Sequence, residues 1–175
     1  MLTILECTSI PDGYDSLFDQ TLPFMDGGTF DWRYIGSPSD VAVKKAHIRQ
    51  QYQTHLDNVN NHVIYWEKDG HPIHLAAGAE LDGFMLWTFA LYGADSGGSK
   101  GWLHDPAYIQ QTRDFLRNDM GLQGYMIECH KDSSIYNYHM AKVGASETYE
   151  VSLEKEEAPA HASDVTVATI KYRYL

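Results

Sequence analysis

A run of nine residues from Phe84 to Tyr92 constrains the fold more than any other part of the sequence. Every side chain in it is apolar or aromatic except that of Thr88. Apolar and polar residues do not alternate here, so both faces of the segment are expected to be buried. We therefore predict a central strand at residues 84–92 and expect the rest of the chain to be arranged around it.

The segment that follows this strand predicts a loop and the start of a helix. Residues 93–101 are mostly Gly, Ser and Ala. Asp105 and Pro106 are typical of a helix start, because Asp caps the first turn and Pro at the first position loses no needed donor. A loop rich in backbone N–H groups beside a helix N-terminus can bind an anion. The alternative is a plain surface turn, which uses the same small residues.

Turn signals place the remaining strands. Asp69-Gly70 and Asp82-Gly83 are typical of tight hairpins, so residues 62–92 are predicted to form a three-stranded antiparallel meander. Another apolar strand is predicted at 124–129. Because a helix connects it to the central strand, these two strands should be parallel.

The ends of the chain complete the expected architecture. Residues 148–153 and 165–174 are predicted to be two antiparallel strands. Helices are predicted at 14–24, from an N-cap at Ser37 to about residue 57, at 106–118 and at 133–144. The sequence thus predicts an α+β protein with an α/β/α layered arrangement, in which a mixed central sheet of about seven strands packs with about four helices. All 175 residues are expected to form a single domain.

Composition excludes several classes of function. The formal net charge of -11 would repel a phosphate backbone, so no nucleic acid is expected as a partner. The sequence has no apolar run of membrane-spanning length and no signal segment at its start, so we expect no membrane partner. Cys7 and Cys129 are expected to be free thiols of a reducing compartment. These features together predict a soluble cytoplasmic protein.

The order of elements resembles that of the GCN5-related N-acetyltransferase superfamily over nearly the whole chain. The resemblance implies that the fourth strand carries acetyl-CoA and that its exit loop, Arg/Gln-x-x-Gly-x-Gly/Ala, cradles the pyrophosphate. It also implies that the fifth strand diverges and leaves a slot for the pantetheine arm. Here Gly98-Ser99-Lys100-Gly101 falls in the loop position. However, the Arg or Gln is missing, and Leu103 stands where the second Gly of the motif would be.

The resemblance also implies which residues contact acetyl-CoA. They are Leu91, Tyr92, Gly97, Gly98, Ser99, Lys100, Gly101 and Trp102. No metal is expected, because His71 and His74 lie three positions apart on a predicted strand and so face opposite sides.

Transfer of an acetyl group to an amine requires that the amine lose a proton and that the leaving thiolate gain one. Glu128 interrupts an apolar strand, and a buried carboxylate there would have a raised pKa suited to a base. The alternative is that Glu128 faces solvent. The family's usual Tyr acid would fall at Met140, so Tyr138 is the candidate acid, with Tyr136 and His139 as alternatives.

The sequence therefore predicts an acyl-CoA-dependent N-acyltransferase that moves an acetyl group from acetyl-CoA to an amine of a small molecule or peptide. The second hypothesis is a catalytically inactive protein with this fold that serves in binding or structure. The degenerate loop motif and Met140 favour the second hypothesis. The aromatic side chains and the C-terminal strand make a homodimer plausible.

Overall fold

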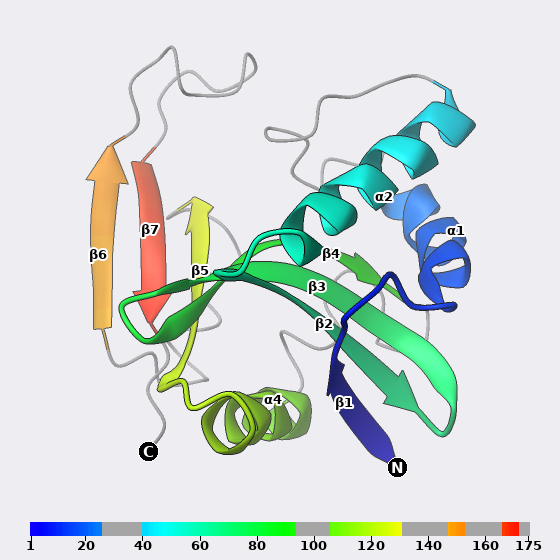
Figure 1. Ribbon diagram of the computed structural model, residues 1–175. Coiled ribbons are helices and arrows are strands. Elements are labelled where there is room, and N and C mark those ends of the chain that lie inside the picture. Colours follow the sequence, from blue (N-terminus) through cyan, green and yellow to red (C-terminus); the bar gives the residue numbers. More distant parts are fainter. Residues whose placement is uncertain (26–39, 94–105, 131–146, 153–165, 172–175) are drawn as a thin grey trace. The chain divides into compact units, whose positions relative to one another are not determined.

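A computed structural model describes residues 1–25, 40–93, 106–130, 147–152 and 166–171 (Figure 1). These residues form seven strands and three helices, which confirms the predicted mixed α+β fold. The helix expected at 133–144 lies outside the described residues. The elements are β1 (Leu2–Glu6), α1 (Tyr14–Met25), α2 (Val41–Leu56), β2 (Asn61–Lys68), β3 (His71–Leu81), β4 (Phe84–Tyr92), α4 (Pro106–Asn118), β5 (Gly124–His130), β6 (Glu147–Ser152) and β7 (Thr166–Lys171).

The strands are hydrogen-bonded in the order β1-β2-β3-β4-β5-β7-β6. β1 pairs with β2, and β2 with β3, in antiparallel fashion. β4 and β5 are parallel, and their register runs from Phe84 opposite Gly124 to Trp87 opposite Ile127. β7 pairs antiparallel with both β5 and β6. The predicted parallel pair and the predicted C-terminal antiparallel pair are both confirmed.

Both predicted hairpin turns are present. Asp69 and Asp82 have φ of 52°, and Gly70 and Gly83 have φ of 79°. Positive φ at both central positions is the pattern of a type I′ turn, whose twist matches that of the flanking strands. Asp tolerates this conformation better than most side chains do, and Gly adopts it without steric cost.

The start of α2 differs from the sequence prediction. The helix begins at Val41, and Asp40 is its N-cap, whose carboxylate accepts a hydrogen bond from the Val43 backbone N–H at 3.0 Å. The predicted N-cap at Ser37 was therefore wrong. An Asp side chain satisfies an orphan N–H of the first turn and also carries the negative charge that a helix N-terminus favours.

The chain groups into two compact units, and β3 and β4 contribute to both. The first unit contains Met1–Ala79 and Thr88–Trp102, and the second contains Glu80–Trp87 and Leu103–Leu175. In the first unit, α1 and α2 pack on the same face of β2, β3 and β4 (Figure 1). The shared core consists of Tyr14, Leu17, Phe18, Ile48, Tyr52, Val63, Tyr65, Leu75, Ala77 and Leu91.

Polar atoms inside this core are hydrogen-bonded to the backbone. The Tyr52 hydroxyl donates to the Leu75 carbonyl at 2.7 Å, and the Tyr14 hydroxyl donates to the Lys45 carbonyl at 2.6 Å. The two rings meet edge to face with centroids 6.0 Å apart. These bonds join α1 to α2 and α2 to β3, and so fix the helices against the sheet.

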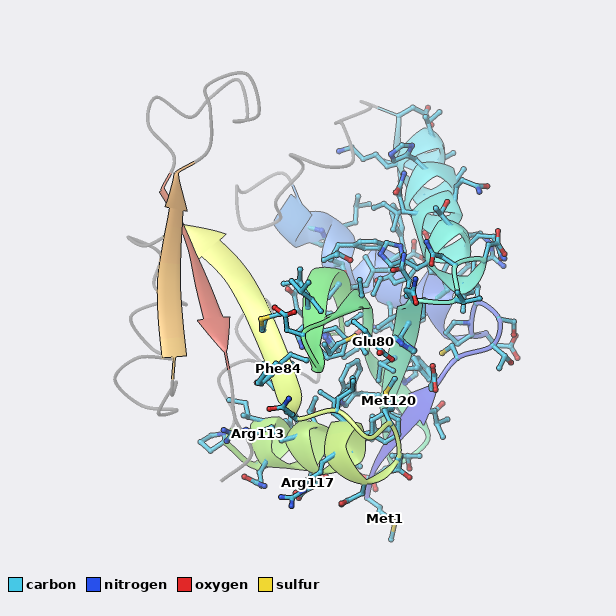
Figure 2. All side chains as sticks on the ribbon, turned by 60° about the vertical axis from the view of Figure 1, so that its left-hand side comes forward. Met1, Glu80, Phe84, Arg113, Arg117 and Met120 are labelled. Atoms are coloured by element: carbon cyan, nitrogen blue, oxygen red, sulfur yellow. The ribbon has the colours of Figure 1, made fainter. Side chains whose placement is uncertain are left out.

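In the second unit, α4 packs against β5. Ile109, Thr112 and Leu116 of α4 are buried, and so are Tyr125 and Met126 of β5. Figure 2 labels Arg113 and Arg117 on α4 and Phe84 at the start of β4. The Gln123 backbone N–H donates to the Gly83 carbonyl at 2.8 Å, which fixes the start of β5 beside the turn that leads into β4.

His74 lies inside the first unit between two aromatic rings. Its ring centroid is 4.7 Å from that of Trp66 and 5.0 Å from that of Tyr92. Its side chain is fully buried, and this burial lowers its pKa well below 6.5. The folded protein therefore holds His74 as a neutral imidazole, whereas the unfolded chain takes up a proton near the ordinary pKa of histidine.

Replacing Leu17 by Ala should lower the free energy of unfolding by about 2–5 kcal/mol, because Leu17 is fully buried among the helices and the change leaves a cavity. Urea unfolding followed by circular dichroism measures this loss. Val59→Ala is the control, because Val59 is 92% exposed, and it should change stability little. A Leu17 variant as stable as the control would contradict this description of the core.

Lowering the pH below about 6.5 should destabilise the protein by up to about 1.4 kcal/mol per pH unit through His74, because the unfolded state binds a proton that the folded state does not. His74→Phe keeps a ring in the core but cannot titrate, so its melting temperature should fall less between pH 7 and pH 5. Equal slopes for the two proteins in thermal melts would refute this assignment.

Candidate functional site

The candidate site is built on the C-terminal half of β4, residues 88–92, in the first unit. The described pairs of β4 with β5 end at Trp87 and Ile127, whereas β4 continues to Tyr92. A strand whose backbone loses one partner must satisfy its N–H and C=O groups in another way. This half of β4 is therefore the part of the sheet at which a side chain or a ligand can replace a neighbouring strand.

The exit of β4 is held from two sides. The Gly93 backbone N–H donates to the Ile73 carbonyl of β3 at 2.8 Å. The Tyr92 N–H donates to Oγ1 of Thr21 on α1 at 2.8 Å, and the Thr21 hydroxyl is 2.9 Å from the Tyr92 carbonyl, to which it can donate. Because successive residues of a strand direct their backbone groups to opposite edges, Thr21 lies at the edge of β4 that faces away from β3.

Thr21 is fully buried, and its hydroxyl also donates to the Leu17 carbonyl of its own helix at 2.7 Å. One hydroxyl proton thus has two carbonyl acceptors, while its oxygen accepts the Tyr92 N–H. This residue satisfies both backbone groups of Tyr92 without a neighbouring strand. Sequence analysis missed Thr21, and a Thr in the middle of a predicted helix gives no signal of such a contact.

Gly93 lies where a side chain would be crowded by its neighbours. A Cβ atom at this position would lie 3.0 Å from the Pro72 carbonyl oxygen, 3.1 Å from Oε1 of Gln20 and 3.2 Å from Cα of Ile73. Two of these are backbone atoms, which cannot move aside as easily as a side chain can. The loop that begins at Gly93 therefore starts from a fixed point between α1 and β3.

The stretch 84–93, which includes β4, has one residue more than the stretch 73–81 of β3 that it faces. The Asp82-Gly83 turn sets Phe84 opposite Leu81, whereas the bond at the other end joins Gly93 to Ile73. We infer a one-residue β-bulge in β4. The Thr88 hydroxyl donates to the Ala77 carbonyl at 3.0 Å, so a side chain of β4 here bonds to a backbone group of β3.

The edge of β4 beside Tyr92 is suited to an extended ligand. The backbone N–H and C=O of Ala90 point to the same edge as those of Tyr92, two residues further along. A ligand that contains amide groups can pair with such an edge as an added strand would. Thr21 marks the place where this pairing must end.

A histidine from α2 contacts the same half of β4. Nε2 of His55 is 3.1 Å from Oγ1 of Thr88, and Nδ1 of His55 is 3.0 Å from the Gln51 carbonyl. The Phe89 ring meets the His55 ring edge to face at 5.3 Å. Sequence analysis missed His55. The available signals were the single polar residue in the apolar run, Thr88, and a histidine in the last turn of a helix.

The two strand residues predicted to contact acetyl-CoA are described in full. The side chain of Leu91 is fully buried in the helix-facing core, so only its backbone can reach a ligand at the strand edge. Tyr92 packs on His74, and burial raises the pKa of Tyr92 to about 12, which keeps the phenol neutral. Both residues lie at the predicted end of the strand, and their contact with a cofactor stays a prediction.

The other predicted site residues lie beyond what the structure describes. The loop residues Gly97, Gly98, Ser99, Lys100, Gly101 and Trp102, as well as Tyr138, are outside the described ranges. Glu128 is on β5 with its backbone opposite Thr169 of β7, and its side chain is not described. The roles assigned to these residues stay predictions.

The described ranges contain no group of three or more His, Cys, Asp or Glu side chains that could hold a metal ion. No helix among them is long and apolar enough to cross a membrane.

Replacing Thr21 by Val should lower the free energy of unfolding by about 1–3 kcal/mol, because it leaves the buried Tyr92 N–H without its acceptor. The Tyr92 amide should exchange its hydrogen faster in this variant, as measured by NMR. Thr21→Ser keeps the hydroxyl and is the matched control. Unchanged exchange at Tyr92 in Thr21→Val would show that Thr21 does not hold the strand edge.

No family model and no curated protein sequence matches the chain. Among solved structures, it is similar to the spermidine N-acetyltransferase from Vibrio cholerae in complex with CoA and spermine. That similarity has a TM-score of 0.62 and 12% sequence identity, over 97% of this chain and 94% of that one.

Two further solved structures are similar over most of their length. A probable acetyltransferase from Staphylococcus epidermidis matches with a TM-score of 0.60 and 10% identity, over 100% of both chains. The ribosomal-protein-S5-alanine acetyltransferase from Vibrio fischeri matches with a TM-score of 0.60 and 10% identity, over 98% of this chain and 93% of that one. Together with the strand order and the parallel β4–β5 pair, these matches show that the chain has the fold of the GCN5-related N-acetyltransferases.

Proposed function

We propose that this protein is an acyl-CoA-dependent N-acyltransferase that moves an acetyl group from acetyl-CoA to an amine of a small molecule or peptide. The observation that carries the proposal is the fixed exit of β4, at which Tyr92 and Gly93 are held by α1 and β3. This exit leads into a glycine-rich segment, and α4 begins directly afterwards at Pro106. The V. cholerae enzyme has a similar fold and was solved in complex with CoA, which supports the same class of ligand here.

The proposed position of the cofactor follows from the chemistry of its parts. The pantetheine arm contains amide groups, which would pair with the edge of β4 at Ala90. The pyrophosphate would then lie beyond Tyr92, against backbone N–H groups of the glycine-rich segment at residues 97–101. Lys100 would add a positive charge, and Trp102 would pack beside the cofactor. A cofactor held along a strand in this way presents its thioester in a fixed direction.

The proposed acceptor is an amine. Two of the similar structures are named for amine acceptors, one for spermidine and the other for the alanine of ribosomal protein S5. The formal net charge of -11 would attract a cationic amine to this chain. The sequence predicts Glu128 as the base and Tyr138 as the acid, and neither side chain is among those that the structure describes. The proposed location is cytoplasmic. A homodimer is proposed as the oligomeric state.

The second candidate is an inactive protein that retains the fold and binds a ligand. It is favoured by the sequence of the exit loop, which lacks the Arg or Gln of the family motif and has Leu103 where a Gly is usual. Met140 in place of the usual Tyr favours it as well. The two candidates differ in whether a bound acyl-CoA releases its thiol.

Saturating acetyl-CoA should raise the melting temperature by several degrees, because a ligand at about 100 times its dissociation constant adds about 2.7 kcal/mol of stability. Gly98→Leu together with Gly101→Leu should abolish the shift, since bulky side chains would block close approach of the pyrophosphate. Val59→Ala should keep the full shift. No shift in the unmodified protein would rule out acetyl-CoA as a ligand, and a shift without thiol release would favour the inactive candidate.

A further inference from the structure

We propose that His55 and Thr88 are the pair of residues that takes the proton from the acceptor amine. This inference rests on the acyltransferase proposal and deepens it by naming a base on α2. The pair joins the last turn of α2 to the middle of β4 through a contact of 3.1 Å between Nε2 of His55 and Oγ1 of Thr88.

Thr88 is at the position on β4 where a reacting group would lie. It is the first residue of the strand after the last described pair with β5, Trp87 and Ile127. It is also the single polar residue of the nine in β4, and its side chain is exposed. Thr88 therefore presents the one aliphatic hydroxyl group of β4 at the point where the described pairing with β5 ends.

The neighbours of His55 fix which of its nitrogens carries a proton. The Gln51 carbonyl can only accept, so Nδ1, which is 3.0 Å from it, must carry the hydrogen. In a neutral imidazole Nε2 then has the lone pair, and this lone pair is directed at the Thr88 hydroxyl. A backbone carbonyl that fixes the tautomer of a histidine is the usual way to present the other nitrogen as a base.

The Thr88 hydroxyl has one proton and two acceptors. It can donate to Nε2 of His55 at 3.1 Å or to the Ala77 carbonyl at 3.0 Å. When His55 is protonated, Nε2 becomes a donor to Oγ1, and the hydroxyl proton is directed to Ala77 instead. Both protonation states therefore satisfy every polar atom of the pair, which is what a proton relay needs.

The described contacts of the His55 ring are uncharged. They come from the Gln51 carbonyl of its own helix and from Thr88 and Phe89 of β4, while β3 contributes the Ala77 carbonyl beyond Thr88. On the helix side, the buried Tyr52 shares the Phe89 ring at 4.6 Å. Asp57, which follows the helix, accepts from the Gln53 amide at 2.8 Å. The ring can therefore gain a proton without breaking an ion pair among these contacts.

The neutral amine nitrogen attacks the thioester carbonyl carbon, and a C–N bond forms. The proton lost by the nitrogen passes to Oγ1 of Thr88 while the hydroxyl proton moves to Nε2 of His55, which becomes imidazolium. The C–S bond then breaks, and the imidazolium returns the proton to the departing thiolate, so that the products are an amide and free CoA thiol.

The first test is the tautomer of His55, which NMR reads from the two imidazole nitrogen shifts in the whole protein at pH 8. The signal of His55 is assigned by its loss in His55→Gln. The expected result is a hydrogen on Nδ1 and a lone pair on Nε2. A hydrogen on Nε2 would leave no base directed at Thr88 and would overturn the proposal, whatever amine the protein acetylates.

The second test is kinetic and follows thiol release from acetyl-CoA, with spermine and in parallel with water as the acyl acceptor. His55→Gln retains polar contacts but cannot take up a proton, so kcat should fall about 10²–10⁴-fold while the acetyl-CoA melting shift is unchanged. Thr88→Val should also have a lower kcat, whereas Thr88→Ser, which keeps the hydroxyl, should have a kcat close to that of the unmodified protein. His62→Gln is the matched control, because His62 contacts Glu6 elsewhere in the first unit.

The dependence of kcat on pH separates a base from a structural contact. The profile of kcat against pH should differ in shape between the unmodified protein and His55→Gln, because the variant has no side chain at this position that can accept the proton of the amine. An unchanged kcat in His55→Gln, or a large loss only in Glu128→Gln, would overturn the assignment and return the role to Glu128. A melting shift without thiol release in the unmodified protein would overturn it in favour of the inactive candidate. The absence of any shift would overturn the acyltransferase proposal itself.

Discussion

The requirement that a largely buried strand satisfy all of its backbone groups governs this structure. β4 is apolar along almost its whole length, so water cannot be the partner of most of its N–H and C=O groups. β3 supplies one edge, and β5 supplies the other only as far as Trp87. Beyond that point Thr21 satisfies Tyr92 from α1. The position of α1, and with it the packing of the first unit, is linked to this one contact.

The same requirement explains why the end of β4 is suited to a ligand. The described pairs of β4 with β5 end at Trp87, and Tyr92 is fixed by Thr21 at the other end of this stretch. An extended molecule with amide groups can complete the ladder there and lose little entropy, because the strand is already in the conformation that pairing needs. The loop that follows starts from a glycine at which an added Cβ atom would crowd the backbone of β3. Packing in the first unit thus fixes both the direction of a bound ligand and the point at which it leaves the strand.

The sequence predicted the sheet well because its signals are local. The Asp82-Gly83 turn and the length of the apolar run placed β3 and β4 correctly, and the parallel pairing followed from the connection through a helix. The N-cap of α2 was misplaced at Ser37 because several residues before Val41 are good caps, and only the backbone conformation distinguishes them.

The contacts of the candidate site could not be predicted in the same way. Thr21 and Tyr92 are 71 positions apart, and His55 and Thr88 are 33 apart. Neither pair has a spacing that a local pattern can reveal, because each depends on how a helix packs on the sheet. Thr88 was visible as the one polar residue in an apolar strand, but its partner became evident only in three dimensions.

The most direct test of the account is hydrogen exchange at the backbone amides of β4 with and without saturating acetyl-CoA. If the cofactor pairs with the open edge of the strand, the Ala90 amide should exchange much more slowly in the complex, while the Tyr92 amide, already bound to Thr21, should change little. Equal exchange at Ala90 with and without acetyl-CoA, at a concentration that raises the melting temperature, would show that the ligand binds elsewhere and would contradict the proposed site.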